Sequence, residues 1–144
     1  MRISDVLRRK GAEVATVRGD ASVADLLKRL ATHNVGALVV SDDGETVAGI
    51  VSERDVVRRL HVEGEGLLHH KVRDIMTSDV VTCEPHHAVD DLMRVMTDRR
   101  VRHVPVLVDG KLAGLVSIGD VVKSRMGELE DEAHQLESYI SGGN

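Results

Sequence analysis

The chain contains one sequence unit twice, and this repetition restricts the possible folds more than any other feature. Residues 49–59 read GIVSERDVVRR and residues 114–124 read GLVSIGDVVKS, so six of eleven positions are identical at an offset of 65. Further upstream, residues 22–30 correspond to residues 88–96 at an offset of 66. Because self-similarity at a fixed period is typical of a duplicated supersecondary unit, we expect two copies of one small fold.

The hydrophobic period changes in the same order within each copy. A short amphipathic turn precedes a brief strand, a helix with one apolar stripe, two β-rich segments joined by a turn, and a closing helix. These segments are residues 3–9, 14–17, 22–30, 37–40, 47–51 and 52–60 in the first copy, and residues 72–76, 80–83, 88–96, 103–108, 112–116 and 117–126 in the second. The repeated order β-α-β-β-α predicts a mixed α/β fold of the α+β type.

One copy alone is too small to be stable, because a unit of roughly sixty residues buries little of its surface and leaves one sheet face uncovered. The simplest arrangement packs the two copies sheet to sheet about a pseudo-twofold axis. The predicted organisation is repeat 1 at residues 3–61, a polar linker at 62–71, repeat 2 at 72–126 and a C-terminal segment at 127–144.

The C-terminal segment is predicted to be an amphipathic helix with a short tail. Leu129, Ala133, Leu136 and Ile140 recur at spacings of 4, 3 and 4 residues among acidic side chains. This spacing is typical of a seam that packs against another helix. We expect the segment to dock on a protein target or on a second copy, and packing on its own domain is the alternative.

Composition argues against several classes of partner and location. The formal net charge is −5, with one Tyr and no Phe or Trp, so neither a phosphate backbone nor base stacking is favoured and no nucleic acid partner is expected. The sequence has no apolar stretch long enough to suggest a membrane span. A single cysteine permits no intrachain disulfide, and the first residues do not resemble a signal peptide. These features predict a cytoplasmic protein.

Each copy ends in a Gly-x-Val-Ser-x-x-Asp segment at the start of its closing helix. At a helix N-terminus, Ser52 and Ser117 could hold a phosphate, and Asp55 and Asp120 could accept hydrogen bonds from a ribose diol. Gly114, like its counterpart in the first copy, would let a ligand approach the strand closely. The same pattern is also a capping box, and both roles can hold at once.

The doubled unit, this motif and the RHVPV sequence at residues 102–106 together resemble a pair of cystathionine β-synthase (CBS) domains, the Bateman module, in a standalone form. The resemblance covers about residues 3–126. It implies that the motif serine contacts phosphate and that the motif aspartate contacts ribose. It also implies a slot for the adenine, lined by Thr16, Val17, Thr82, Cys83 and Val104. Beside this slot, it implies that Arg102 and His103 contact the phosphates.

The two copies differ where the resemblance places phosphate contacts. The first copy has Gly36 and Ala37 in place of Arg102 and His103, and only Arg54, inside its motif, could substitute. The sequence therefore predicts two unequal sites, with the stronger one at the motif of the second copy.

Metal binding and catalysis are not expected. The chain has adjacent histidines at positions 69 and 70 and at positions 86 and 87, but neighbours rarely share one face, and no Cys-x-x-Cys or helical His-x-x-x-His accompanies them. Cys83 fits a small buried strand residue. Because no dinucleotide or P-loop glycine pattern is present and no catalytic domain remains, we expect neither an enzyme nor a required cofactor.

The sequence leaves two functional hypotheses. The first is a regulatory module that binds AMP, ADP, ATP, NAD or S-adenosylmethionine between its repeats and signals through a change of shape or partner. The alternative is a scaffold that dimerises without binding nucleotide. In both, we expect a homodimer that covers the apolar helix stripes at residues 23–30 and 89–96.

Overall fold

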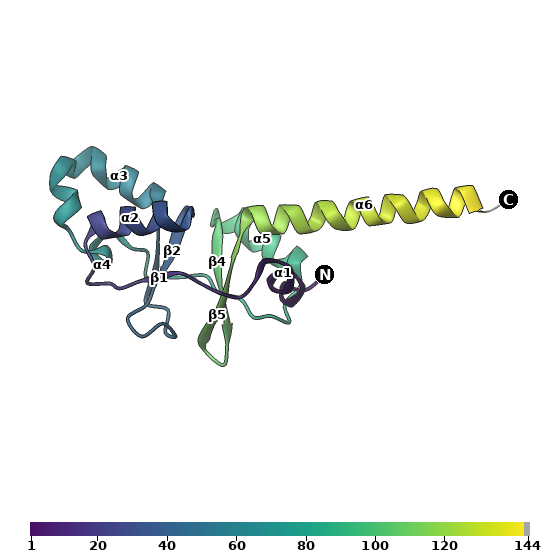
Figure 1. Cartoon of the computed structure of the whole chain (residues 1–144), viewed down its shortest axis with the longest axis horizontal. Helices are drawn as coiled ribbons and strands as arrows, with labels where there is room; N and C mark the ends of the chain where they lie inside the picture. The colour runs from purple at the N-terminus through teal and green to yellow at the C-terminus, as the bar shows by residue number, and fades with distance from the viewer. Residues whose placement is uncertain (143–144) are drawn as a thin grey trace.

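The computed structural model of the chain describes residues 1–142 and contains two similar halves followed by a long helix (Figure 1). The first half has α1 (Ile3–Lys10), β1 (Thr16–Val17), α2 (Val23–His33), β2 (Ala37–Val40), β3 (Gly49–Ser52) and α3 (Glu53–Glu63). The second has a 3-10 helix η1 (Gly64–His69), α4 (Val72–Ile75), α5 (Val89–Arg99), β4 (His103–Val108), β5 (Lys111–Ser117) and α6 (Ile118–Gly142). The predicted mixed α/β class is confirmed, and the element order agrees except that the described residues 76–88 form no strand.

Each half has a small sheet, with three strands in the first half and two in the second. In the first, β1 runs parallel to β2, and β2 pairs antiparallel with β3. In the second, β4 and β5 form the antiparallel pair, and the strand predicted at residues 80–83 is reduced to one parallel bridge between Cys83 and Val106. The β-branched side chains of these strands suit a buried pleated surface.

The two hydrophobic cores do not follow the two sequence repeats. Ile3 and Leu7 of α1 belong to the core of the second repeat, with Val104 and Val116. Val72 and Ile75 of α4 belong to the core of the first. The leading helix of each repeat therefore packs on the other repeat, so the halves interlock, and a cut at residues 62–71 would not separate two complete cores.

The segment expected to be a polar linker is part of the first core. Leu67 of η1 is fully buried among the side chains of that core, whereas Leu68 is 37% exposed. Because glycines and charged residues dominate the composition of this segment, the sequence did not indicate that Leu67 is a core residue.

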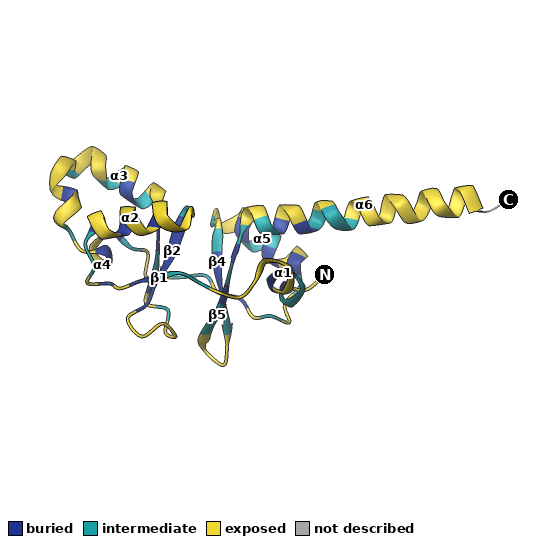
Figure 2. Cartoon of the chain, viewed as in Figure 1, coloured by how far each residue is buried: buried dark blue, intermediate teal, exposed yellow. Residues whose placement is uncertain are grey.

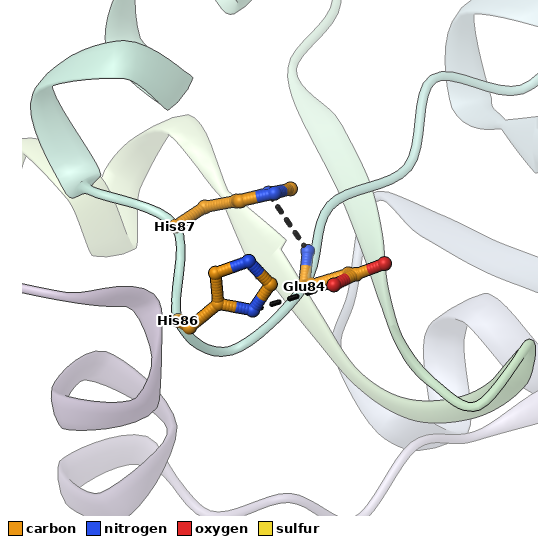
Figure 3. Close-up of side chains that lie close together, drawn as sticks. All are labelled: Glu84, His86 and His87. Atoms are coloured by element: carbon orange, nitrogen blue, oxygen red, sulfur yellow. Dashed lines mark hydrogen bonds and ion pairs between the residues drawn. The ribbon is translucent and has the colours of Figure 1, made fainter.

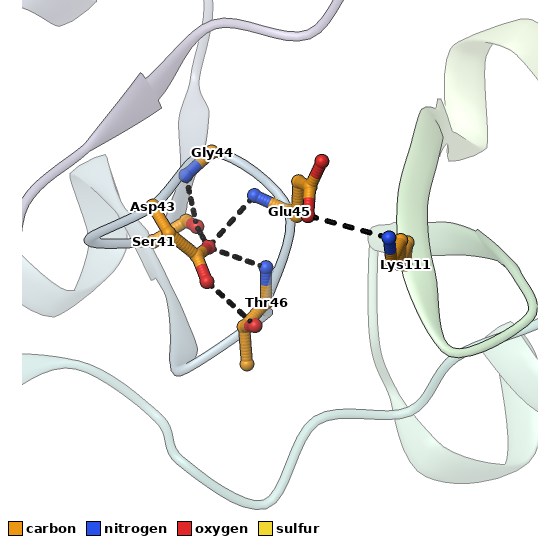
Figure 4. Close-up of polar contacts among 6 residues, drawn as sticks. All are labelled: Ser41, Asp43, Gly44, Glu45, Thr46 and Lys111. Atoms are coloured by element: carbon orange, nitrogen blue, oxygen red, sulfur yellow. Dashed lines mark hydrogen bonds and ion pairs between the residues drawn. The ribbon is translucent and has the colours of Figure 1, made fainter.

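A polar loop and a hairpin also join the two halves (Figure 4). The Asp43 carboxylate accepts hydrogen bonds from the Glu45 and Thr46 backbone amides at 2.8 and 2.7 Å, and these bonds hold its pKa well below the usual range. The ordered loop then presents Glu45 to the other half, where its carbonyl accepts from the Leu112 amide at 2.8 Å and its carboxylate lies 3.6 Å from Lys111. These contacts help fix the relative position of the repeats.

The glycines of the repeated motif make room for the chain itself. A Cβ at Gly114 would lie 2.7 Å from Leu7 Cδ2, and a Cβ at Gly49 would lie 2.7 Å from the Thr77 carbonyl oxygen. Sequence analysis assigned Gly114 to a ligand contact, but here α1 occupies the space above it.

The apolar stripes proposed for dimerisation are covered within the chain. Leu26 and Leu30 of α2 are buried, as are Leu92 and Met96 of α5. Most of each stripe is therefore already packed inside the chain, although Leu27 of α2 remains 37% exposed, and the homodimer itself stays a prediction. Most of the exposed large apolar side chains lie on α3 and α6, which are largely exposed (Figure 2).

α6 is one continuous helix, so the closing helix of repeat 2 and the predicted C-terminal helix are not separate elements. Within residues 1–142, no helix is long and apolar enough to cross a membrane.

Candidate functional site

A cavity of about 500 Å³ lies between the two repeats. One wall comes from the first repeat, including the start of α3. The other comes from the second repeat, through the segment before the Cys83 bridge and the segment that enters β4. The lining residues are Gly36, Ala37, Ile50, Ser52, Glu53, Arg54, Asp55, Val57, Thr77, Asp79, Val80, Val81, Arg100, Val101, Arg102 and His103.

The first motif presents a preorganised carboxylate to this cavity. Ser52 is the N-cap of α3, and Asp55 Oδ2 accepts hydrogen bonds from the Ser52 amide at 2.8 Å and the Ser52 hydroxyl at 3.1 Å. The predicted capping box is therefore formed. Among residues 1–142, the structure shows no hydrogen bond to the second oxygen, Asp55 Oδ1. The cap orients the side chain and leaves this oxygen to accept from a ligand.

Basic side chains from both repeats surround the same cavity. Arg54 comes from the first motif, and Arg100 and Arg102 come from the segment before β4. All three side chains are exposed, and none forms a salt bridge within the described part of the chain. Guanidinium groups in this arrangement suit a phosphate.

His103 adds a neutral imidazole beside these arginines. Burial lowers its pKa below the usual value, and the charges of Lys10 and Arg102 lower it further, while Asp120 and Glu53 oppose this shift. At neutral pH, His103 therefore offers a hydrogen bond rather than the positive charge implied by the family resemblance.

The second motif has the same cap, but its carboxylate is paired with a lysine of the same chain. Asp120 Oδ2 accepts from the Ser117 amide at 2.9 Å and from Lys10 Nζ at 2.5 Å, and Lys10 Nζ also donates to the Leu115 carbonyl at 2.6 Å. Burial raises the pKa of Asp120, but the hydrogen bonds from Lys10 and Ser117 outweigh it, and the pKa is lowered. This carboxylate is paired with Lys10 of α1 through Oδ2, and within residues 1–142 its Oδ1, like that of Asp55, accepts no hydrogen bond.

The predicted site residues fall into five groups. Ser52, Arg54, Asp55, Arg102 and His103 share the cavity between the repeats. Thr16 and Val17 line a different cavity of about 580 Å³. Cys83 and Val104 are buried, and Thr82 is exposed outside both cavities. Gly114, Ser117 and Asp120 line neither of these two cavities.

Sequence analysis missed Arg100, Val80 and Val81 as cavity residues. Arg100 has a left-handed backbone at the end of α5, so the chain turns there and directs the following residues along the cavity. The basic RRVRH sequence at residues 99–103 was an available signal for this wall.

Cys83 has the character of a core residue. Burial and the neighbouring Glu84 charge raise the pKa of its thiol to about 12. The reactive thiolate form is therefore strongly disfavoured at neutral pH.

The histidine pair after Cys83 is closer together than expected (Figure 3). The rings of His86 and His87 are edge to face at 4.6 Å, and the ligand atoms of both lie within 4.8 Å of Glu84 and of each other. However, His87 Nδ1 accepts from the Glu84 amide at 3.0 Å, and His86 Nδ1 lies 3.3 Å from the Glu84 carboxylate. These exposed groups thus partner one another and order the loop.

The fold and the doubled motif define a pair of CBS domains. The family model described as "CBS domain" matches residues 3–62 and 72–127, and the chain belongs to this family. It is 42% identical to the mitochondrial CBS domain-containing protein CBSX3 of Arabidopsis thaliana over 98% of this chain and 72% of that protein.

Solved structures agree with this assignment. A CBS-domain protein from Agrobacterium tumefaciens, ATU1752, has a TM-score of 0.84 and 45% identity and covers 87% of this chain and 99% of its own. The CBS pair of protein MJ0100, crystallised in complex with 5′-methylthioadenosine and S-adenosyl-L-methionine, has a TM-score of 0.76 at 23% identity, covering 85% of this chain and 98% of its own. CBS pairs are in general regulatory modules, and MJ0100 shows that this fold can hold adenosine compounds.

Proposed function

We propose that this chain is a non-catalytic cytoplasmic regulator that binds one adenine nucleotide in the cavity between its repeats. The observation that carries the proposal is that Asp55, whose Oδ1 accepts no hydrogen bond from residues 1–142, lines the same cavity as Arg54 and Arg102. AMP, ADP, ATP, NAD and S-adenosylmethionine are the candidate ligands. The MJ0100 complex supports an adenosine compound as the class of ligand.

The proposed arrangement combines residues of both repeats. Asp55 binds the ribose hydroxyls, Ser52 and the start of α3 meet the phosphates, and Arg102 approaches the phosphates from the opposite wall. Binding would then hold the two halves in one relative position. A ligand that binds one relative position of the halves more tightly than another shifts the population toward that position, and this shift is the signal.

The proposal is tested by thermal unfolding of the full chain with the five candidate ligands. A ligand at a hundred times its Kd stabilises the native state by about 2.7 kcal/mol. For a chain of this size, that raises Tm by at least about 5 °C. Guanine nucleotides provide the control. If no adenine compound raises Tm, the proposal is wrong and the scaffold alternative remains.

Nucleotide affinity is expected to depend on pH through His103. Its pKa in the free protein is lowered, and a bound phosphate would raise it, so binding takes up a proton and affinity increases as pH falls. We expect about a threefold gain between about pH 8 and pH 6 in wild type relative to His103→Gln, measured by calorimetry. The ligand's own titration affects both proteins and cancels. An identical pH profile in the variant would contradict this role.

We further propose that the protein is a homodimer formed through exposed apolar residues of α3 and α6, which lie on the same side of the molecule in Figure 1. Leu60 is 46% exposed and Val122 is 45% exposed. The double variant Leu60→Glu/Val122→Glu should be monomeric in sedimentation at micromolar concentration, because burying two charges per subunit opposes association. Val108→Glu, at a residue 46% exposed on β4, is the control and should stay dimeric. A wild-type monomer would refute this interface.

A further inference from the structure

The distal part of α6, residues 129–142, extends beyond both cores (Figure 1). Every residue in it is exposed. The preceding turn still contacts the body, since Glu128 lies 3.3 Å from the N-terminal amine. Beyond this point about 20 Å of helix stands in solvent, at 1.5 Å per residue. Helices this short are only marginally stable without a packing partner.

One face of this distal α6 segment is apolar. Leu129 is 48% exposed, Leu136 is 62% exposed and Ile140 is 73% exposed, and Ala133 lies between them. Their 4, 3, 4 spacing corresponds to heptad positions d, a, d and a, so they form one narrow seam along the helix. In coiled coils, a narrow seam of this kind packs against one partner helix.

The charges beside the seam select the partner. The flanking e and g positions are Glu130, Glu132, Glu137 and Tyr139. In a pair of identical helices, parallel or antiparallel, glutamates would face glutamates across the seam, which is unfavourable. A helix with Lys or Arg at these flanking positions would instead form attractive pairs.

We propose that residues 129–142 bind a basic amphipathic helix of another protein, with aliphatic side chains in the seam and Lys or Arg beside it. α6 also carries the second motif at its first turn, where Asp120 meets Lys10. One continuous helix therefore joins the second motif to the docking surface. The docking surface does not depend on nucleotide binding, so either proposal can fail without the other.

The test uses two synthetic three-heptad peptides and the full chain. Both peptides carry Leu at a and d, and they differ only in having Lys or Glu at e and g. We expect the Lys peptide to bind at least about tenfold more tightly in fluorescence anisotropy, with affinity falling as salt is added. Equal binding of both peptides, or binding of neither, would overturn the proposal.

Surface variants identify the binding face without disturbing the cores. Leu129→Ser/Leu136→Ser should lose binding of the Lys peptide, and Glu132→Lys/Glu137→Lys should prefer the Glu peptide. Asp131→Ser, on the back of the helix, should bind like wild type. If the Leu129→Ser/Leu136→Ser variant instead halves the sedimenting mass of the protein alone, a second copy occupies the seam and the proposal is wrong.

Discussion

Replacing Asp55 with asparagine is expected to weaken adenine-nucleotide binding about a hundredfold. The proposed ribose contact consists of hydrogen bonds to a charged acceptor, each worth about 1.5–3 kcal/mol. Asparagine keeps the size of the side chain and an oxygen that can still accept from the Ser52 amide, so α3 should remain capped. Calorimetric titration of the two proteins, with circular dichroism to verify the fold, measures the effect.

Asp120→Asn is the matched control. Asp120 has the same capping contact with its serine but already binds Lys10 at 2.5 Å. We expect the Asp120→Asn change to alter nucleotide affinity by less than about threefold. Sequence analysis favoured the opposite order, because Arg102 and His103 belong to the second repeat. In the structure, those two residues line the cavity that also contains the first motif, while His103 pairs with Ser117 of the second motif across β4 and β5. A larger loss from Asp120→Asn would restore the order predicted from sequence.

Truncation of Leu67 should destabilise the protein by about 2–5 kcal/mol, the usual cost of a buried Leu→Ala change that leaves a cavity. Leu67 is fully buried in the first core although it lies between the two repeats. Denaturant unfolding of Leu67→Ala measures the loss.

Leu68→Ala is the neighbouring control, since Leu68 is 37% exposed and its truncation should cost less than about 1 kcal/mol. Equal losses from the two variants would show that η1 does not anchor the first core. A normal stability for Leu67→Ala would show that residues 62–71 are only a connection.

Local patterns were sufficient to predict most elements of the fold. The apolar stripe of α2, with Val23, Leu26 and Leu30, predicts both the helix and its buried face. The exchange of α1 and α4 between the cores could not be predicted this way. Ile3 and Val72 show that their helices are amphipathic, but the pattern does not identify which sheet they cover.

The capping motifs could also be predicted from a local pattern, because Ser52 and Asp55 interact within one helical turn. The sequence did not predict that the first motif and Arg102 line one cavity, because this depends on how the two repeats pack. The Lys10 contact with Asp120 spans 110 positions and belongs to the exchanged helix. Contacts of this kind require the tertiary structure.

A crystal structure of the full chain, grown with the nucleotide that gives the largest rise in Tm, tests the central claim most directly. We predict difference density in the cavity between the repeats, with the ribose hydroxyls within hydrogen-bond distance of Asp55 and the phosphates beside Arg102. Density beside Asp120 with Lys10 displaced and the first cavity empty would contradict the proposed site.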